Sequence, residues 1–241
     1  MSTKMVGRAV GALFLLAFVV YATGGALVDS GSGAPDVLAA VADNQLRVSA
    51  GALLMLVNSA VVASIGVLAF PVLKAHDELS AYAYLVGRAI EAVLLTAGIL
   101  FLLILVPLAQ EYADAGADGA SGLPALARVA KVGNHYSYQL AMISVGAVGM
   151  VFCRVLSRAR LVPRFLAVWG LVGYGVFLLG AVLEILGYAV GVALSVPGGL
   201  FEITLGVLLV VRGFPARQRQ DPDGPTGDTS TTAPVATPAA C

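Results

Sequence analysis

The sequence predicts an all-α membrane protein: a bundle of six transmembrane helices with both termini in the cytoplasm. Hydrophobic residues make up 59% of the 241 residues and charged residues only 12%, against about 25% charged residues in an ordinary soluble domain. The mean hydropathy is +0.92, which excludes a water-soluble globular protein. Basic and acidic residues balance at 14 each, so the composition does not predict nucleic acid as a partner.

Six apolar stretches are long enough to cross a hydrocarbon core of about 30 Å, which takes about 20 helical residues. They are almost continuously apolar, unlike the alternating segments of a membrane β-barrel. The lipid bilayer is therefore the expected environment. The six predicted spans cover residues 6–28, 49–70, 82–108, 136–155, 165–187 and 190–211.

Several spans have features of their own. The first follows Lys4 and Arg8, as a secretory signal would, but we expect it to remain as the first helix of the bundle. The third is longer than the bilayer requires and should tilt or protrude. After it, residues 111–133 are predicted to form the longest loop, with a short helix within 124–132. The sixth span contains Pro197, so its helix either starts there or is kinked there.

The charges outside the spans predict the orientation, because Lys and Arg accumulate in cytoplasmic connections. Most basic residues lie before the first span, after the second, after the fourth and after the sixth: Lys4, Arg8, Lys74, Arg154, Arg158, Arg160, Arg164, Arg212, Arg217 and Arg219. The other connections have three basic residues, Arg47, Arg128 and Lys131, beside the acidic residues Asp29, Asp36, Asp43, Glu111, Asp114 and Asp118. We therefore expect a multi-pass protein of the cytoplasmic membrane with both termini inside.

The start of the fifth span combines proline, a cation and tryptophan. Pro163 ends the preceding loop, and Arg164 and Trp169 are predicted to anchor the helix at the membrane interface. Four arginines in and beside this loop are candidates for binding anionic lipid: Arg154, Arg158, Arg160 and Arg164. A plain topology signal explains the same arginines and is preferred.

The chain divides into residues 1–214, the predicted six-helix domain, and residues 215–241, a predicted disordered cytoplasmic tail rich in Pro, Thr, Asp, Gly and Ala. Cys153 is expected to be a packing residue, and Cys241, as the last residue, does not form a prenylation signal. The two cysteines and two histidines lack the spacing of a metal site. No metal or cofactor is expected.

Polar residues inside the spans are the candidates for a site: Asn58, Arg88, Glu91 and Glu202. At the helical rise, Asn58, Glu91 and Glu202 all lie about 14 to 15 Å from one end of their spans, with Arg88 about one turn nearer the cytoplasm. Ionisable residues at such depth usually face the bundle interior. We predict that the four converge on one polar site. Alternatively, Arg88 pairs with one glutamate and locks the bundle, while the other glutamate points toward a headgroup or a trapped water.

Short motifs support a family resemblance by their order and spacing: Arg88-Ala89-Ile90-Glu91-Ala92, Leu161-Val162-Pro163-Arg164-Phe165-Leu166 before Trp169-Gly170, and Pro197 with Phe201-Glu202 before Val211-Arg212-Gly213-Phe214. From residue 8 to residue 214, the chain resembles bacterial membrane proteins classed as domain of unknown function 4386. Their usual ending is an aromatic residue, Lys, Gly and Phe, from which Val211-Arg212 departs while keeping a cation. The resemblance implies a six-helix bundle and attention to Arg88, Glu91, Arg164 and Glu202, but no activity.

The sequence has no catalytic signature, since Gly-x-Ser-x-Gly, His-Glu-x-x-His and paired aspartates are all absent. We therefore do not expect an enzyme. The expected function is that of a noncatalytic membrane component, such as a scaffold, a stress-related factor or a partner subunit. The alternative is a small transporter or an ion or proton pathway that uses Asn58, Arg88, Glu91 and Glu202.

Overall fold

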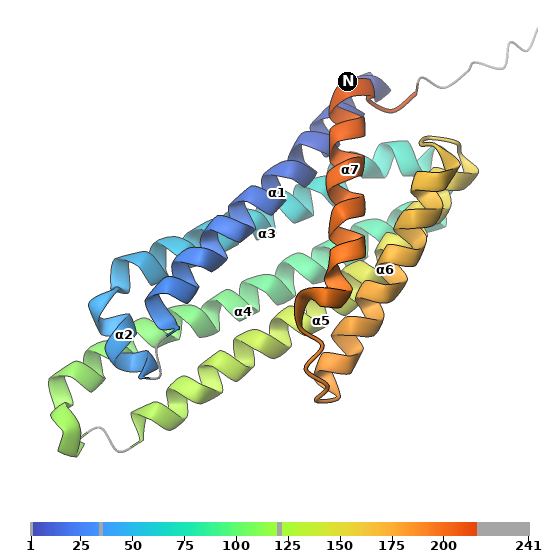
Figure 1. The fold of residues 1–241 in the computed structure, drawn as a ribbon. Helices are drawn as coiled ribbons and strands as arrows, with labels where there is room; N and C mark the ends of the chain where they lie inside the picture. Colours follow the sequence, from blue (N-terminus) through green and yellow to red (C-terminus); the bar gives the residue numbers. More distant parts are fainter. Residues whose placement is uncertain (1, 34–35, 120–121, 216–241) are drawn as a thin grey trace, which may run out of the picture.

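The computed structural model describes residues 2–33, 36–119 and 122–215. All of the secondary structure in these segments is helical (Figure 1). The helices are α1 (Thr3–Ser32), α2 (Val37–Asp43), α3 (Gln45–Lys74), α4 (Glu78–Gly119), α5 (Leu123–Arg158), α6 (Arg164–Ile185), the 3-10 helix η1 (Gly191–Ser195) and α7 (Val196–Arg212).

Six of these helices are long and apolar enough to cross a membrane: α1, α3, α4, α5, α6 and α7. This confirms the predicted all-α bundle of six spans and identifies a multi-pass membrane protein. Each long helix packs against the next one along the chain, and α7 packs against α1. The six helices therefore form a closed ring around a common interior.

The two ends of the bundle differ. The start of α1 and the end of α7 meet at one end, where Gly7 touches the backbone at Phe214, and the turns joining α3 to α4 and α5 to α6 lie at that end too (Figure 1). We call it the terminal end. The opposite end carries α2, the end of α4, the start of α5 and the end of α6 (Figure 1), and we call it the α2 end. Residues 216–241, including most of the predicted tail and Cys241, lie outside the described residues.

The prediction of a long loop at residues 111–133 is wrong. Helix α4 continues to Gly119 and α5 begins at Leu123, so most of that segment is helical. The reason is tertiary packing: Ala109, Ala127 and Ala130 are buried against α2 and its neighbours, which stabilises helix well beyond the apolar part of either span. The third span is thus longer than predicted.

Helix α2 was not predicted, because seven residues are too few for a clear periodicity. Asp36 caps it by accepting a hydrogen bond from the Ala39 N–H at 3.1 Å, as N-cap aspartates do. Leu38 and Val41 are almost fully buried in a small apolar cluster that also includes Val28 of α1. Helix α2 therefore covers the bundle at this end.

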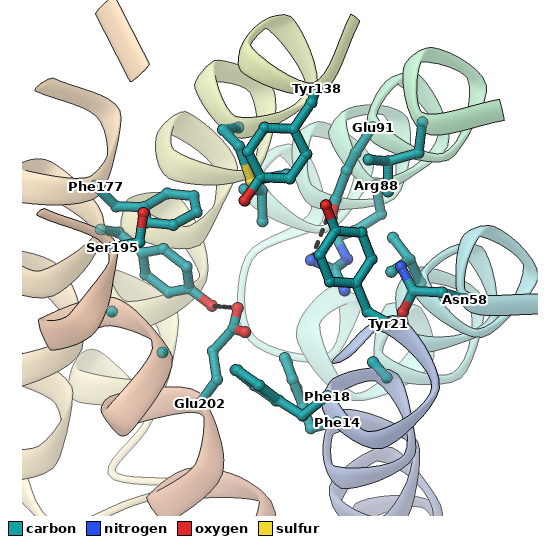
Figure 2. Close-up of a pocket in the computed structure, with 18 residues that line it drawn as sticks. Phe14, Phe18, Tyr21, Asn58, Arg88, Glu91, Tyr138, Phe177, Ser195 and Glu202 are labelled. Carbon is teal, nitrogen blue, oxygen red and sulfur yellow. Dashed lines mark hydrogen bonds and ion pairs between the residues drawn. The ribbon is translucent and has the colours of Figure 1, made fainter. Parts of the chain in front are cut away.

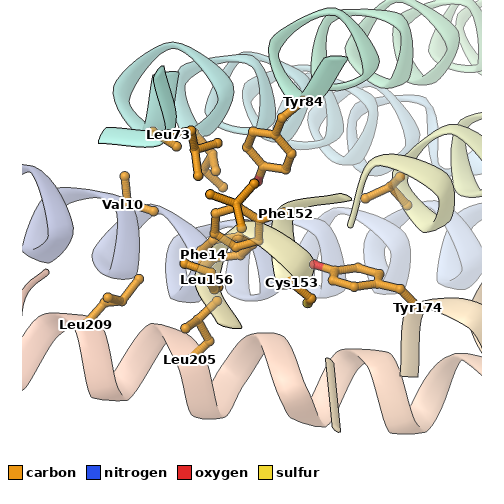
Figure 3. Close-up of a cluster of buried hydrophobic side chains, with 14 of the residues drawn as sticks. Val10, Phe14, Leu73, Tyr84, Phe152, Cys153, Leu156, Tyr174, Leu205 and Leu209 are labelled. Carbon is orange, nitrogen blue, oxygen red and sulfur yellow. The ribbon is translucent and has the colours of Figure 1, made fainter. Parts of the chain in front are cut away.

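The largest apolar cluster fills the terminal half of the ring (Figure 3). The Tyr84 ring of α4 stacks on Phe152 of α5 with centroids 4.7 Å apart, and Phe14 of α1 lies 6.5 Å from Phe152. Leu205 of α7 is fully buried in this cluster, and Cys153 is buried there as well, as expected for a packing residue. This buried layer lies on the terminal side of the residues described next.

The sequence left open whether the last helix starts at Pro197 or is kinked there, and the structure shows the first. Pro197 lies in the first turn of α7, and η1 forms the connection from α6. A proline costs no hydrogen bond at this position because the first N–H groups of a helix lack intrahelical partners. The helix therefore starts at the proline and is not kinked there.

Candidate functional site

A cavity of about 240 Å³ lies inside the ring of helices. All four candidates from the sequence line it: Asn58 of α3, Arg88 and Glu91 of α4, and Glu202 of α7. Figure 2 shows Glu202 on one side of the cavity and Arg88 with Glu91 on the other. The structure thus brings together residues separated by up to 144 positions along the chain.

Arg88 and Glu91 form a buried ion pair, with Arg88 Nη1 2.9 Å from Glu91 Oε2. The guanidinium also lies between two aromatic rings, 5.8 Å from the centroid of Phe14 and 5.9 Å from that of Tyr84, at cation–π distance. Because both charged residues belong to α4, their ion pair joins no two helices. The predicted pairing of Arg88 with one glutamate is present, but the pair itself does not cross-link the bundle.

A glycine of α3 makes room for Arg88. A Cβ atom placed on Gly66 would lie 2.9 Å from the Cβ of Arg88, closer than side-chain carbons pack. Small residues allow such close approach of membrane helices. Gly66 therefore fixes the approach of α4 to α3 at the level of the ion pair.

Glu202 has a different partner. The Tyr174 hydroxyl of α6 donates a hydrogen bond of 2.6 Å to Glu202 Oε1. Among the described residues Glu202 forms no ion pair, and it is half-buried, whereas Tyr174 is buried. Arg88 forms its ion pair with Glu91. The partner of the Glu202 carboxyl group, which lines the cavity, is therefore a neutral hydroxyl group.

Further polar atoms around the cavity have no hydrogen-bond partner among the described residues. They are Asn58 Oδ1 and Arg88 Nε, whose residues line the cavity, and Tyr84 Oη, whose ring lies beside the Arg88 guanidinium. Asn58 is 5% exposed, and a buried polar atom without a partner is costly. Asn58 Oδ1 can only accept a hydrogen bond, so it suits a ligand or a water that donates one.

A second cavity of about 310 Å³ continues toward the α2 end. It shares Tyr21, Asn58 and Tyr138 with the first cavity and extends to Lys131 and Asn134. The rings of Tyr21 and Tyr138 stack with centroids 6.0 Å apart where the two cavities meet. The two cavities therefore lie next to each other, and polar side chains are among the residues that line both of them.

Glu184 lies near this second cavity. Its Oε2 atom is 3.9 Å from Nε2 of His135, one of the residues that line the cavity. Among the described residues no group of three or more histidine, cysteine, aspartate or glutamate side chains could hold a metal ion.

The sequence reasoning missed the aromatic part of the site. Tyr21, Tyr138 and Tyr174 line the cavity together with Phe18 and Phe177. The tyrosines could have been identified from the sequence. Tyrosine in membrane helices concentrates at the two interfaces, so a tyrosine in the middle of a span is unusual. Tyr174 lies near the middle of α6, where a phenol needs a polar partner.

The predicted anchors lie where the sequence placed them, although their function as anchors stays a prediction. Arg164 is the first residue of α6 and is exposed, and Trp169 packs partly buried against the apolar cluster. Arg154, Arg158 and Arg160 are exposed at the terminal end. Together with Arg164 they form a basic surface, called the arginine surface below.

A comparison with models of protein families gave a match. The model of a family described as "Domain of unknown function (DUF4386)" matches residues 9–213. No curated protein and no solved structure matches.

Proposed function

Since the chain belongs to the DUF4386 family, whose function is unknown, we propose a function from its own residues: a noncatalytic transporter of the cytoplasmic membrane that binds a small organic cation, such as a protonated amine, in the central cavity. The observation that carries the proposal is the position of Glu202. Its carboxyl group faces the cavity, accepts a hydrogen bond from Tyr174 and forms no ion pair with a described residue.

The charge of the cavity supports a cationic ligand. The cavity lining has one guanidinium group, that of Arg88, and two carboxyl groups, those of Glu91 and Glu202. The guanidinium group forms its ion pair with Glu91. An ionised Glu202 therefore lacks a counter-ion, which an ammonium group would supply. Ionisable residues inside a membrane commonly mark such a substrate or ion pathway.

The aromatic walls support an organic cation in particular. Phe14, Phe18 and Phe177 line the cavity together with tyrosines, and the faces of aromatic rings attract ammonium groups. Asn58 Oδ1 offers an additional acceptor for an N–H group. The cavity thus combines an anion, an acceptor and aromatic faces, as ligand sites with a few placed polar groups do.

The cavity residues favour binding over nucleophilic catalysis. The described residues that line the central cavity include Ser195 but no histidine, cysteine or lysine. A serine nucleophile needs an adjacent base that can take its proton. The polar cavity favours the transport alternative over a pure scaffold, because a scaffold does not need a polar cavity.

The orientation is part of the same proposal. The basic residues of the connections concentrate at the terminal end, including Lys74, Arg158 and Arg212, which supports placing both termini in the cytoplasm. A reporter that is active only in the cytoplasm, fused after residue 215, should be active. Activity of an exclusively extracytoplasmic reporter at the same position would overturn the orientation.

Ligand class can be tested with a matched pair of probes, benzylamine and benzoate. In lipid nanodiscs benzylamine should raise the melting temperature of the wild-type protein in a concentration-dependent way, because a ligand that binds only the folded state stabilises it. Benzoate, of similar size and opposite charge, should not. Glu202→Gln should abolish the effect of benzylamine.

The control for this test is Glu111→Gln, which removes a carboxylate from an exposed position of the same bundle. This variant should respond to benzylamine as the wild type does. Equal stabilisation by benzylamine and benzoate, or an unchanged benzylamine response in Glu202→Gln, would contradict the proposed cation site.

A further inference from the structure

The groups that the neighbouring helices place around the Glu202 carboxyl group are neutral. Helix α7 packs against α1, α6 and η1. From these elements Tyr21, Tyr174 and Ser195 bring hydroxyl groups to the central cavity, and Tyr174 donates the hydrogen bond of 2.6 Å to Glu202 Oε1. Hydroxyl groups of tyrosine and serine carry no charge near neutral pH. The described cavity residues of α1, α6 and η1 therefore include no cation.

The cations of the surrounding helices have other partners. Across the cavity (Figure 2), Arg88 of α4 forms its ion pair with Glu91 at 2.9 Å, so these two residues together add no net charge. Arg8 of α1 donates a hydrogen bond to the carbonyl oxygen of Val211, about 14 Å along α7 from Glu202 by the helical rise. Other titratable groups of α4 and α5 in the cavity lining and the adjacent apolar cluster are neutral near neutral pH: Tyr84, Tyr138 and Cys153.

An ionised Glu202 would thus give the cavity one uncompensated negative charge. Glu202 lies about 15 Å along α7 from Arg212 by the helical rise, which places this charge inside the membrane. A carboxylate without a partner at such depth is costly, and the group takes up a proton or finds a counter-ion instead. Glu202 therefore needs one positive charge, which either a proton or a bound organic cation can supply.

The hydrogen bond from Tyr174 is compatible with both states of Glu202. The hydroxyl group of Tyr174 binds Oε1, so Oε2 is the atom that can carry a proton. The Oε1 atom of a protonated carboxyl group can still accept this hydrogen bond, and both oxygens accept hydrogen bonds when the group is ionised. Tyr174 therefore holds the carboxyl group in the same place with either positive charge.

We propose that a proton and the organic cation compete for Glu202, so that the protein exchanges one for the other across the membrane. This inference rests on the proposed cation site and names the ion against which the cation is exchanged. When an ammonium group binds, the O–H bond at Oε2 breaks, its electron pair stays on the carboxylate and the proton goes to water. The site is neutral in both states, and only the empty, ionised site carries the costly charge. Movement of the cation in one direction is therefore coupled to movement of a proton in the other.

Proton release on ligand binding tests the inference. The probe is benzylamine, which is already an ammonium ion at acidic and neutral pH, as the lysine side chain is, so a proton released on binding comes from the protein. Isothermal titration calorimetry in lipid nanodiscs, in two buffers of different ionisation enthalpy, counts these protons. The wild type should release about one proton per bound benzylamine at acidic pH, and the binding constant should then rise about tenfold per pH unit.

Three variants assign the proton to a residue. Glu202→Asp keeps a carboxyl group and should bind benzylamine with release of a proton, whereas Glu202→Gln should lose both. His135→Gln is the control, because His135 lines the second cavity and histidine titrates in the same pH range; this variant should release protons as the wild type does. In infrared difference spectra, benzylamine should remove the C=O stretching band of a protonated carboxyl group, and this change should be absent in Glu202→Gln.

The possible failures can be told apart. If benzylamine binding depends on Glu202 but releases no proton and has the same affinity at every pH, the exchange is wrong while the cation site stands. Proton release that disappears in His135→Gln would assign the proton to the histidine and would also overturn the exchange at Glu202. If benzylamine does not bind to the wild type, both proposals are wrong.

Discussion

Glu91 and Glu202 face the same cavity with different partners, and this difference sets what each contributes. Glu91 neutralises Arg88 at 2.9 Å, and both are at least 95% buried. Glu202 accepts a hydrogen bond from Tyr174. Removing one member of a buried ion pair leaves the other charge uncompensated and strongly destabilises the fold. Replacing a carboxylate by an amide that still accepts the same hydrogen bond lowers the free energy of unfolding far less.

Glu91→Gln should therefore lower the free energy of unfolding by about 3 to 5 kcal/mol, because Arg88 remains buried without a counter-ion. The measurement is chemical unfolding of the purified protein in one detergent. Glu78→Gln provides the control, because its ion pair with Lys74 is exposed and should contribute at most about 1 kcal/mol. A Glu91→Gln variant as stable as the control would mean that Arg88 finds another partner.

Glu202→Gln should change the free energy of unfolding by less than about 2 kcal/mol, because the glutamine oxygen can still accept the hydrogen bond from Tyr174. The same unfolding experiment measures it. An unchanged or increased stability would indicate that the carboxylate is kept for ligand binding at a cost to stability. A loss as large as that of Glu91→Gln would make Glu202 a structural residue and remove the basis of the cation site.

At the scale of elements, the contact between α1 and α7 closes the ring of helices. Gly11 and Gly206 allow the two backbones to meet, as small residues do at membrane helix interfaces.

The start of α4 is stabilised by an N-terminal cap. Asp77 accepts hydrogen bonds from the N–H and the hydroxyl of Ser80 at 3.0 and 2.9 Å.

Gly11→Leu should destabilise the bundle by about 1 to 3 kcal/mol, as overpacking does, because even a Cβ atom there would lie 2.8 Å from Leu209 and close to the α7 backbone. Chemical unfolding measures the loss. Gly25→Leu on the same helix has free space and should be close to wild type. Equal stability of the two variants would show that the α1–α7 contact is not tight.

The Asp77 cap should give a pH-dependent contribution. The hydrogen bond from the Ser80 N–H, then the one from its hydroxyl, lowers the pKa of Asp77 below its ordinary value of 3.8. A lowered pKa in the folded state means that the stabilisation is complete above that ordinary value and is lost as the pH falls through the lower folded value. Wild type should therefore melt higher than Asp77→Ala at neutral pH, and the difference should shrink in strong acid. A difference independent of pH would exclude the ionised cap.

At the scale of the whole molecule, the charges divide the protein into two unlike ends. Arg154, Arg158, Arg160 and Arg164 are all exposed, and they lie at the end that we place in the cytoplasm, where anionic lipids attract basic residues. The opposite end has α2 and the second cavity. A basic face at one end and a cavity toward the other suit a protein with a fixed orientation.

The alternative to a plain topology signal is that the arginine surface binds anionic lipid headgroups, and this alternative can be tested. The double change Arg158→Gln and Arg160→Gln should weaken retention of phosphatidylglycerol by about 1 kcal/mol per arginine, or about 30-fold in total, measured by lipid exchange in nanodiscs. Arg47→Gln with Arg128→Gln, at the opposite end, is the control. Equal retention in both double variants would leave the arginines with their topological function alone.

The sequence by itself determined the number of spans and the four intramembrane candidates. Continuous apolar stretches of sufficient length can satisfy their backbone hydrogen bonds in lipid only as helices, so the six spans followed from composition and length. The cost of burying Arg88, Glu91 and Glu202 in hydrocarbon required an inward orientation, so their convergence could be predicted from depth alone.

Tertiary structure decided what surrounds those residues. The packing of the helices decided which glutamate pairs with Arg88 and that Tyr174 donates a hydrogen bond to Glu202. It also decided where α4 ends and α5 begins. Packing is set by the shapes of side chains brought together from distant parts of the chain, such as Gly11 against Gly206. Apolar sequence contains little of that information, because in lipid any apolar helix surface is acceptable until a second helix meets it.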